Sequence, residues 1–476
     1  MNFILFLNIF VLFLIFKIKC NPDAKRLYED LMAPYNKLVR PVFNSSEMIN
    51  VKLGLKLFQI LDLNLKKEYL LTNMMVSHEW NDYSLRWNFS DYGNVKQLYI
   101  PADKLWLPDI ILYNNADDAY ELSIKTNAVI HYDGTVIWQS PTTFKSHCEI
   151  NVEYFPFDLQ TCKLHFTSWT HGDNINLKHH NYKSSEPGID LNNYFLNVEW
   201  DVLSVTALEQ KKNFNCCTDI YSDIFFTIHL RRKTFFYIFS LLIPISLLSF
   251  LTVFVFYLPA NSGEKVSLII SILLSLTFLL LIYIDIMPST SICLPVLGKY
   301  LIFILLLVIL SLIITCFILN VHFRSPNTHK MSPWSKTFFL KTLPPYLLID
   351  LSIENQKFLL SSNNNITTNI KTFASKSIQT PTTGYIYSAE INRAIRNTLF
   401  IAYHLENKDT FENCKQDWQI MALVLDRMFF YLFFLLHLVG TIAIFLSITS
   451  IYDSSNPIDL QQSKINKDFE NILKTF

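Results

Sequence analysis

The sequence predicts a multidomain membrane protein, with an extracellular β-sandwich followed by a four-helix transmembrane bundle. Hydrophobic residues make up 51% and charged residues only 17% of the 476 residues, fewer charges than the ~25% usual for soluble domains. The apolar residues gather in long runs, and four of these reach the ~20 residues that cross a bilayer. Ahead of them lies a long segment in which apolar and polar residues alternate over short stretches, as in half-buried strands.

The composition argues against two classes of function. Lys plus Arg and Asp plus Glu both number 40, so the chain lacks the basic excess of a nucleic-acid binder. Glycine occurs only 9 times, and neither G-x-G-x-x-G nor G-x-x-x-x-G-K-[ST] is present. We therefore expect no nucleic-acid partner and no nucleotide-dependent enzyme.

Residues 1–20 predict a secretory signal peptide. Met1–Phe16 is apolar but too short to span a bilayer comfortably, and a polar segment follows. A signal anchor is the alternative, because the usual positive charges before the apolar run are missing. Export would place residues 21–233 outside the cell and make Asn44 and Asn88, which begin N-x-[ST] motifs, glycosylation sites.

The exported segment predicts a β-sandwich. Short alternating stretches recur, and turn signals that contain Gly93 and Gly134 separate them. Pro22–Leu38 is the exception, because its leucines follow an approximate helical stripe. The expected strands include Val51–Leu57, Tyr83–Phe89, Ala128–Trp138 and Phe225–Leu230.

Four apolar runs predict transmembrane spans. They are Phe235–Leu258, Val266–Ile284, Val296–Leu319 and Phe429–Thr449. With the amino end exported, four spans return the carboxyl end to the outside. We therefore assign the first three spans to residues 234–320, a cytoplasmic loop to 321–427, the fourth span to 428–450 and an extracellular tail to 451–476.

The cytoplasmic loop divides into two parts. Residues 325–385 are rich in Ser, Thr, Asn and Pro, and we expect them to be mostly disordered. An apolar stripe at helical spacing then predicts an amphipathic helix near 387–413. The loop holds more Lys and Arg than Asp and Glu, which agrees with the positive-inside tendency, although long loops follow it weakly.

Four of the eight cysteines lie in the exported segment, at Cys148, Cys162, Cys216 and Cys217. Four cysteines allow three pairings, of which we favour Cys148–Cys162 together with Cys216–Cys217. An adjacent pair closes only through a strained ring outside ordinary disulfide geometry, so two free thiols are the alternative there. The spacing fits no zinc site, and we expect no metal.

These features resemble the Cys-loop ligand-gated ion channels over nearly the whole chain. The Cys148–Cys162 loop contains Phe-Pro-Phe-Asp and precedes four spans with a long loop before the last. The adjacent cysteines are the mark of nicotinic acetylcholine receptor α subunits. Supporting segments are Trp106–Asp117, Gly263–Lys265 and Asn320–Pro326.

The resemblance implies an α-type, principal-face subunit of a pentameric, cation-selective channel that acetylcholine or a related cationic agonist opens. It implies sister subunits in the same pentamer, a plasma-membrane location at the postsynaptic side, no enzymatic activity and no cofactor. Two alternatives stay open. One is a subunit that assembles without binding agonist, and the other is a membrane-anchored adhesion or recognition protein.

The resemblance also implies an aromatic agonist site, because a quaternary ammonium is held by the faces of aromatic rings. The ligand-binding residues would be Tyr113, Trp169, Phe214, Cys216, Cys217 and Tyr221. The family usually has tyrosine where this chain has Phe214, which keeps the ring and loses the hydroxyl. That departure is the reason for the alternative of a subunit that binds no agonist.

The second span predicts a pore-lining face, because its residues advance by three or four positions along one side of a helix. The face consists of Glu264, Ser267, Ser271, Leu274, Phe278, Ile282 and Asp285. Glu264 and Asp285 would lie about 31 Å apart at ~1.5 Å per residue, one at each end of the span. Rings of such carboxylates favour cations; serines that merely pack helices together are the alternative.

By resemblance, coupling between agonist and pore involves the loop Phe155, Pro156, Phe157 and Asp158 and the pair Arg231 and Arg232. The acidic partner that the family carries in an early strand loop is absent, because that stretch reads Leu63-Asn64-Leu65-Lys66. We expect the arginine to pair with Asp158 instead.

One position predicts a heteromer. In relatives that form agonist-binding homomers, a tryptophan on an early strand supplies an aromatic wall from the neighbouring subunit. Alignment on Thr72-Asn73 and Trp80 places Met75 at that position. Methionine fills apolar space but has no ring to attract an ammonium, so a sister subunit would have to provide this wall.

Overall fold

The computed structural model describes residues 21–44, 46–117, 124–170, 174–180, 188–213, 220–289, 293–324, 331–349, 389–448 and 455–459. The chain forms two compact units. The first unit comprises Met1–Phe236, Ile286–Pro295 and Thr449–Phe476, and the second comprises Tyr237–Asp285 and Val296–Ile448. The predicted signal peptide, Phe214, Cys216 and Cys217 lie outside the described residues.

The first unit begins with helix α2 (Pro22–Met32). Asn21 caps it by accepting hydrogen bonds from the backbone N–H groups of Asp23 and Ala24, and proline occupies the first helical position. Leu27 and Leu31 are buried as the stripe predicts. The helix is shorter than expected: it ends at Met32, and Leu38 is 84% exposed.

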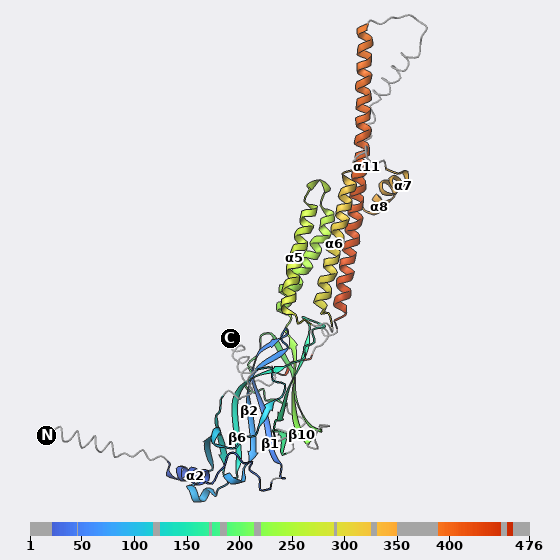
Figure 1. The fold of residues 1–476 in the computed structure, drawn as a ribbon. Coiled ribbons are helices and arrows are strands. Elements are labelled where there is room, and N and C mark those ends of the chain that lie inside the picture. Colours follow the sequence, from blue (N-terminus) through green and yellow to red (C-terminus); the bar gives the residue numbers. More distant parts are fainter. Residues whose placement is uncertain are drawn as a thin grey trace, which may run out of the picture. The chain divides into compact units, whose positions relative to one another are not determined.

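The rest of the first unit is a sandwich of two sheets (Figure 1). The six-stranded sheet has the order β3-β5-β6-β2-β1-β8 and the four-stranded sheet the order β4-β7-β10-β9. The strands of the larger sheet are β1 (Ile49–Asn64), β2 (Tyr69–Asn81), β3 (Gln97–Pro101), β5 (Asn127–His131), β6 (Thr135–His147) and β8 (Ile175–His179). Those of the smaller sheet are β4 (Ile110–Leu112), β7 (Leu159–Ser168), β9 (Trp200–Asn213) and β10 (Ile220–Arg232).

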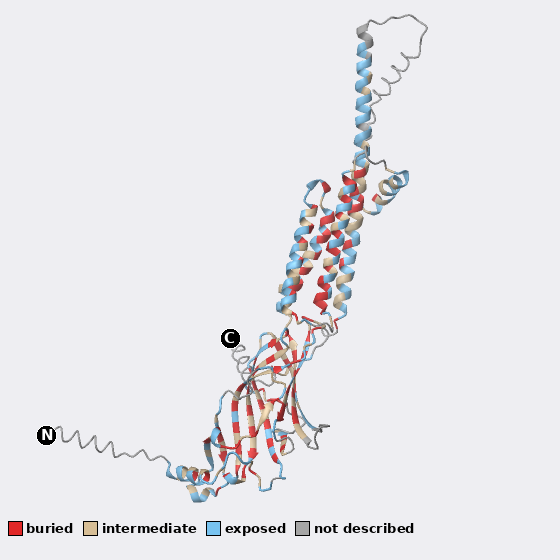
Figure 2. Ribbon diagram, viewed as in Figure 1, coloured by how far each residue is buried: buried red, intermediate tan, exposed pale blue. Residues whose placement is uncertain are grey.

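Alternation along each strand builds the core of the sandwich. In β2 the even-numbered residues from Leu70 to Trp80 are buried, and the residues between them lie on the outward face. The same period appears as red stripes along the strands in Figure 2. The four-stranded sheet contributes Leu164, Phe166 and Phe226 to the same core. The predicted β-sandwich is therefore present.

One expected strand is wrong. Tyr83–Phe89 forms no strand; it holds the 3₁₀ helix η1 (Tyr83–Leu85) and the start of η2 (Phe89–Tyr92). The side chain of Asp82 accepts a hydrogen bond from the Ser84 N–H, and that of Asn88 accepts one from Ser90. Such local bonds compete with the strand ladder, so an alternating pattern here does not produce a strand.

Both expected turns are present. Gly93 and Gly134 have φ values of +58° and +84°, in the region that glycine adopts readily. A Cβ at position 134 would lie 2.5 Å from the carbonyl oxygen of Asp82. Gly134 makes the tight turn between β5 and β6, which divides the expected strand Ala128–Trp138 in two. A third 3₁₀ helix, η3 (Ala102–Lys104), follows β3.

The second unit contains the apolar helices. Among the described residues, four helices are long and apolar enough to cross a membrane: Phe235–Tyr257, Lys265–Ile286, Val296–His322 and Arg396–Leu446. The first combines α3 (Phe235–Tyr237), the π-helix η4 (Ile238–Leu242), α4 (Ile243–Phe254) and η5 (Val255–Tyr257). The next elements are η6 (Ala260–Ser262), α5 (Lys265–Ile286) and α6 (Val296–His322).

The loop before the last span is more helical than expected. The short helices α7 (Pro333–Thr337), η7 (Phe338–Thr342) and α8 (Leu343–Tyr346) fall in the segment expected to be mostly disordered. Ser332 caps α7 by accepting a hydrogen bond from Ser335 N–H. The amphipathic helix and the fourth span form one continuous helix, α11 (Ala389–Leu446), of 58 residues. It contains no proline or glycine before Gly440 that would break it.

Burial of His78 generates a prediction about stability. His78 is in β2, stacks on Trp138 of β6 with ring centres 5.1 Å apart, and is buried. Burial lowers its pKa to about 4 from the usual 6.5, so the folded state holds the neutral ring. The unfolded chain gains the proton first as the pH falls. The contribution to the free energy of unfolding is therefore complete above about pH 6.5 and declines by about 3 kcal/mol toward pH 4.

We expect His78→Phe to reduce the pH dependence of thermal unfolding between pH 6.5 and 4, measured on the full chain in detergent. His131→Gln, on β5 of the same sheet and partly exposed, is the matched control and should keep the wild-type slope. Equal slopes in the wild type and His78→Phe would contradict the prediction.

Candidate functional site

Three of the predicted agonist aromatics lie on adjacent strands of the four-stranded sheet. Tyr113 directly follows β4, Trp169 directly follows β7, and Tyr221 lies near the start of β10. Ile224 of β10 pairs with Phe166 of β7, and the two strands are antiparallel. Tyr221 lies three residues before Ile224 and Trp169 three residues after Phe166, so both lie at the same end of the sheet. Tyr113 is 58% and Trp169 63% exposed. Large aromatic surfaces thus stand open at one edge of the sandwich.

Asp109 holds the backbone around Trp169. Its carboxylate accepts hydrogen bonds from the Ser168 hydroxyl at 2.7 Å and from the Thr170 N–H at 2.6 Å, and also from the Thr170 hydroxyl. Its carbonyl oxygen accepts a bond from the Trp169 N–H. One carboxylate therefore fixes both residues that flank the ring. Local spacing does not predict this role of Asp109, because its partners are about sixty positions away.

Asn114 fixes the strand segment that carries Tyr113. Its amide donates to the carbonyl oxygens of His147 and Lys163 at 3.0 and 2.7 Å, and its oxygen accepts from the His165 N–H. The Tyr113 N–H donates to the His165 carbonyl oxygen at 2.7 Å. Residues on β6 and β7 therefore determine where the Tyr113 ring stands.

The cysteine loop is closed by the predicted Cys148–Cys162 disulfide. Asp158 within it meets Arg232 at the end of β10: the guanidinium Nε lies 2.7 Å and Nη2 3.1 Å from the two carboxylate oxygens. The expected pairing with Asp158 is thus present. Sequence reasoning missed the second carboxylate, Glu199, which accepts from Nη1.

Aromatic rings complete this arginine site. The Arg232 guanidinium lies 4.1 Å from the ring centre of Trp200 and 5.1 Å from that of Phe155, as a cation over aromatic faces. Arg231 points elsewhere: Nη2 is 3.7 Å from an Asp201 oxygen, and Nη1 donates to the Ser455 carbonyl oxygen. The two neighbouring arginines therefore belong to separate contacts.

The predicted pore face lies on one side of α5. All seven of its residues are exposed in this single chain: Glu264, Ser267, Ser271, Leu274, Phe278, Ile282 and Asp285. The buried residues of the helix are Lys265, Ile269, Ile272, Leu276 and Tyr283. The buried positions advance by three or four residues apart from one gap, so α5 turns one face toward its own bundle. The predicted stripe belongs to the wider exposed side of the helix, which also includes Ile270 and Thr277.

Lys265, next to Glu264, is directed into the bundle. Its ammonium nitrogen lies 2.6 Å from a carboxylate oxygen of Asp426 on α11, and both side chains are almost completely buried. Two neighbouring residues of opposite charge are thus separated: Glu264 is exposed, whereas the charge of Lys265 is neutralised inside the unit.

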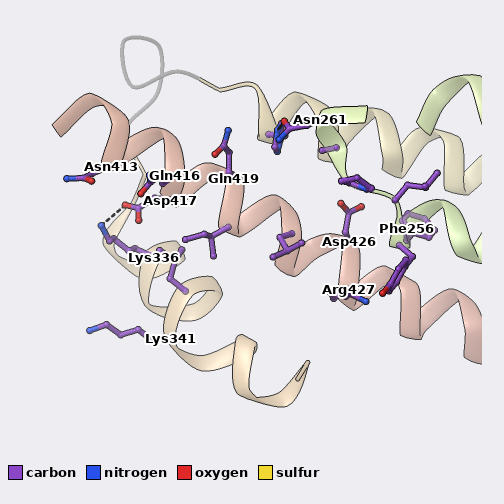
Figure 3. Close-up of a pocket in the computed structure, with 18 residues that line it drawn as sticks. Phe256, Asn261, Lys336, Lys341, Asn413, Gln416, Asp417, Gln419, Asp426 and Arg427 are labelled. Carbon is purple, nitrogen blue, oxygen red and sulfur yellow. Dashed lines mark hydrogen bonds and ion pairs between the residues drawn. The ribbon is translucent and has the colours of Figure 1, made fainter. Parts of the chain in front are cut away.

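A cavity of about 700 Å³ lies in the second unit, between the segment 256–261, the short helices α7 and η7, and α11 (Figure 3). Lys336 and Asp417 form an ion pair on its wall, 2.6 Å apart, and Arg427 lies 4.4 Å from the ring centre of Tyr257. Its lining residues include none of the predicted agonist or pore residues. Within the described part of the chain, no group of acidic, histidine and cysteine side chains could hold a metal ion.

Comparison with known proteins decides the family. Residues 24–234 match the neurotransmitter-gated ion-channel ligand binding domain, and residues 241–445 match the neurotransmitter-gated ion-channel transmembrane region. The chain belongs to the neurotransmitter-gated ion channels. Its relatives include acetylcholine receptor subunit alpha-like 2 of Drosophila melanogaster, 42% identical over 96% of this chain and 93% of the relative.

Two further relatives show how the subunit types compare. Acetylcholine receptor subunit alpha-L1 of Schistocerca gregaria is 42% identical over 94% of both chains. Acetylcholine receptor subunit beta-like 2 of Drosophila melanogaster is also 42% identical, over 94% of this chain and 92% of the relative. Overall similarity therefore does not separate alpha-like from beta-like subunits.

Membership of this channel family has three consequences. The resemblance read from the sequence is confirmed, the sheets followed by apolar helices are the ligand-binding and transmembrane parts of a channel subunit, and the protein is not an enzyme. The alternative of a membrane-anchored adhesion or recognition protein is therefore set aside. The ligand-binding domain of this channel family is extracellular, which agrees with the predicted export.

The Asp109 contacts predict a loss of ligand binding. Asp109→Asn keeps the shape but replaces a charged acceptor of several hydrogen bonds, each worth about 1.5–3 kcal/mol, so the Trp169 segment loosens. We expect the channel's ligand to bind about tenfold more weakly in equilibrium binding to membranes. Asp103→Asn, an exposed acid in η3, is the control. Affinity that stays at the wild-type value in Asp109→Asn at normal surface expression would refute the role of Asp109.

Proposed function

We propose that this chain is the α-type, principal-face subunit of an acetylcholine-gated, cation-selective channel in the plasma membrane, at the postsynaptic side. Agonist would bind at an extracellular interface between subunits, and the pore would be lined by α5. The observation that carries the proposal is the aromatic trio on the four-stranded sheet, in which Tyr113 and Trp169 are exposed and Tyr221 is half-buried. Exposed rings held by backbone contacts are suited to a quaternary ammonium.

The adjacent cysteines support the α-type assignment. In this reading Cys216 and Cys217 form a disulfide at the tip of the loop that enters β10, and Phe214 and Tyr221 flank it. The second candidate is a subunit of the same channel that assembles without binding agonist, and Phe214 favours it, because the family usually has a tyrosine there. Asn44 and Asn88, both exposed, are proposed glycosylation sites of the extracellular domain.

The position of Met75 supports a heteromer. Met75 lies on the outward face of β2, in the six-stranded sheet, whereas the three aromatics belong to the four-stranded sheet. An aromatic wall opposite the trio would therefore come from another copy or a sister subunit. At the position of this wall, the chain itself carries only the thioether of Met75, which has no aromatic ring.

Expression in oocytes tests the agonist and the heteromer together. We expect acetylcholine currents when the chain is co-expressed with non-α sister subunits and none when it is expressed alone. Met75→Trp should give the chain currents on its own, because it restores an aromatic wall; Asn73→Trp, two residues away on the same outward face, should not. Robust currents from the unmodified chain alone would refute the heteromer.

The exposed stripe of α5 supports a cation pore. Glu264 and Asp285 stand at its two ends, and the stripe between them begins with Ser267 and Ser271 and continues with apolar side chains. In a ring of subunits the carboxylates would attract cations, and Leu274 and Phe278 would form an apolar constriction that closes by dewetting.

Charge reversal tests the pore. We expect Glu264→Lys in the co-expressed receptor to lower permeability to cations and to shift the reversal potential when external sodium is replaced by a large organic cation. Glu412→Lys reverses an exposed charge on α11 and serves as the control. A reversal potential that does not move in Glu264→Lys would exclude this face from the ion path.

Coupling is proposed to run through the arginine site. Phe155, Asp158 and Arg232 form one buried cluster in which the cysteine loop meets the end of β10, and the first apolar helix begins only three residues after Arg232. A movement of β10 on agonist binding would therefore reach the cysteine loop and the start of the first span together. Pro156, Phe157 and Arg231 complete the proposed coupling segment.

A further inference from the structure

A buried ion pair adjoins the acidic residue at one end of the proposed pore face. Lys265, the first residue of α5, places its ammonium nitrogen 2.6 Å from a carboxylate oxygen of Asp426 on α11. The two side chains are only 1% and 7% exposed. Glu264, one position earlier, is exposed. The proposed function uses Glu264 and gives neither member of the pair a task.

The loop that leads into α5 is held in place before it reaches the pair. Oδ1 of Asn261 lies 2.8 Å from Nε2 of His322, the last residue of α6. Gly263 then turns the chain with a φ of +72°, which glycine adopts readily. The carbonyl oxygen of Glu264 accepts a hydrogen bond from the Leu268 N–H at 3.0 Å. The backbone of Glu264 is therefore already in helical register.

Helical register separates the directions of Glu264 and Lys265. Consecutive residues of an α-helix point about 100° apart, and here the carboxylate is on the exposed side while the ammonium is inside the bundle. The lysine charge stands on a flexible stem of four carbon atoms. Once released, that stem is long enough to bring the ammonium around to the exposed side. Its positive charge would then lie beside the carboxylate of Glu264.

Asp426 is what holds the ammonium inside. Among the described residues, its Oδ2 is the one acceptor to which the Lys265 ammonium donates. The other oxygen of Asp426, Oδ1, is buried and has no hydrogen-bond partner in the described part of the chain. Arg427, the next residue of α11, directs its guanidinium over the ring of Tyr257 instead. Loss of the Asp426 charge would therefore leave the buried ammonium without an acceptor.

Stability alone is a weak reason for an ion pair at this place. The cost of removing two charges from water can exceed their attraction, and well-packed apolar residues of similar volume often stabilise a protein as well or better. Both helices are otherwise rich in such residues where they meet their own bundle. The position of the pair, next to a pore acid, indicates a role in the charge of the pore.

We infer that Asp426 determines the charge at this end of the pore, because it holds the Lys265 ammonium inside the helical unit. This inference deepens the proposed function and rests on it. With the ammonium held inside, Glu264 acts on passing cations without a positive charge beside it. Asp426 itself touches no ion, so it is a positioning residue for the charge selectivity of the α5 face.

The side of the membrane determines which current changes. Export of the amino end places the start of α5 on the cytoplasmic side, so a released ammonium acts first on cations that enter from the cytoplasm. A unit charge roughly 10 Å away through water changes the local concentration of cations about twofold. We expect Asp426→Asn to lower the outward conductance about twofold and the inward conductance less, so that the current rectifies inwardly.

Single-channel recording from the co-expressed receptor tests the inference. The channels are opened by acetylcholine in excised patches with symmetrical sodium chloride, and the ratio of outward to inward conductance is measured. Combining Lys265→Gln with Asp426→Asn should restore the wild-type ratio, because the released charge is then absent. Asp426→Ser releases the ammonium through a different side chain and is read in the same way should Asp426→Asn not reach the cell surface.

Asp417→Asn is the matched control. It breaks another lysine–aspartate contact of 2.6 Å on the same helix, but the lysine, Lys336, belongs to α7 and is 55% exposed. No charge is released beside Glu264 in this variant. The ratio of outward to inward conductance should therefore stay at the wild-type value.

The outcomes separate the two levels of the argument. A wild-type ratio in Asp426→Asn overturns the inference and leaves the proposed function standing. An equal fall in the double variant also overturns it, because altered packing and not a released charge would be the cause, and so does an equal fall in Asp417→Asn. Absence of any acetylcholine-gated cation current in the unmodified receptor overturns the proposed function and this inference with it.

Discussion

A single buried guanidinium, that of Arg232, holds together the end of the sandwich at which β10 ends. Arg232 is almost completely enclosed, and a buried charge is tolerated only when it is paired and hydrogen-bonded. Two carboxylates from different segments meet it, Asp158 in the cysteine loop and Glu199 just before β9, and Trp200 lies flat against it. The disulfide at Cys148–Cys162 holds that loop in reach. Without the arginine, the carboxylates of Asp158 and Glu199 would lose the positive charge that both contact.

The site at the other end of these strands follows the same logic. Asp109 fixes the segment of Trp169, Asn114 fixes that of Tyr113, and Asp223 faces His165. The aromatic rings rest on buried or half-buried polar groups, each of which meets a partner in another segment of the sheet. Their precise placement is therefore a property of the whole four-stranded sheet. Because β7 and β10 run through both ends, the proposed ligand site and the arginine site share these two strands.

The local sequence pattern predicted part of the fold and of the candidate site. Alternation predicted the sheets, run length predicted the spans, and spacing placed the α5 stripe on one face. Pattern failed where side chains bond neighbouring backbone groups, as at Asp82 and Asn88. It also did not predict that the amphipathic helix and the fourth apolar run form one continuous helix, α11. It did not predict the contacts of Asp109, Asp223 or Asp426, because each meets its partner across 58 to 161 positions of sequence. Such pairs become visible only when strands and helices are assembled.

The Lys265–Asp426 pair also has a consequence for how the last helix is seated. It joins the first residue of α5 to a point in α11 that lies beyond a long intervening loop. Sliding or rotating α11 by one residue would leave two buried charges unmatched, at a cost of several kcal/mol. The pair thus fixes the position of α11 along and around its axis relative to α5. The length and composition of the connecting loop can therefore vary without changing this register.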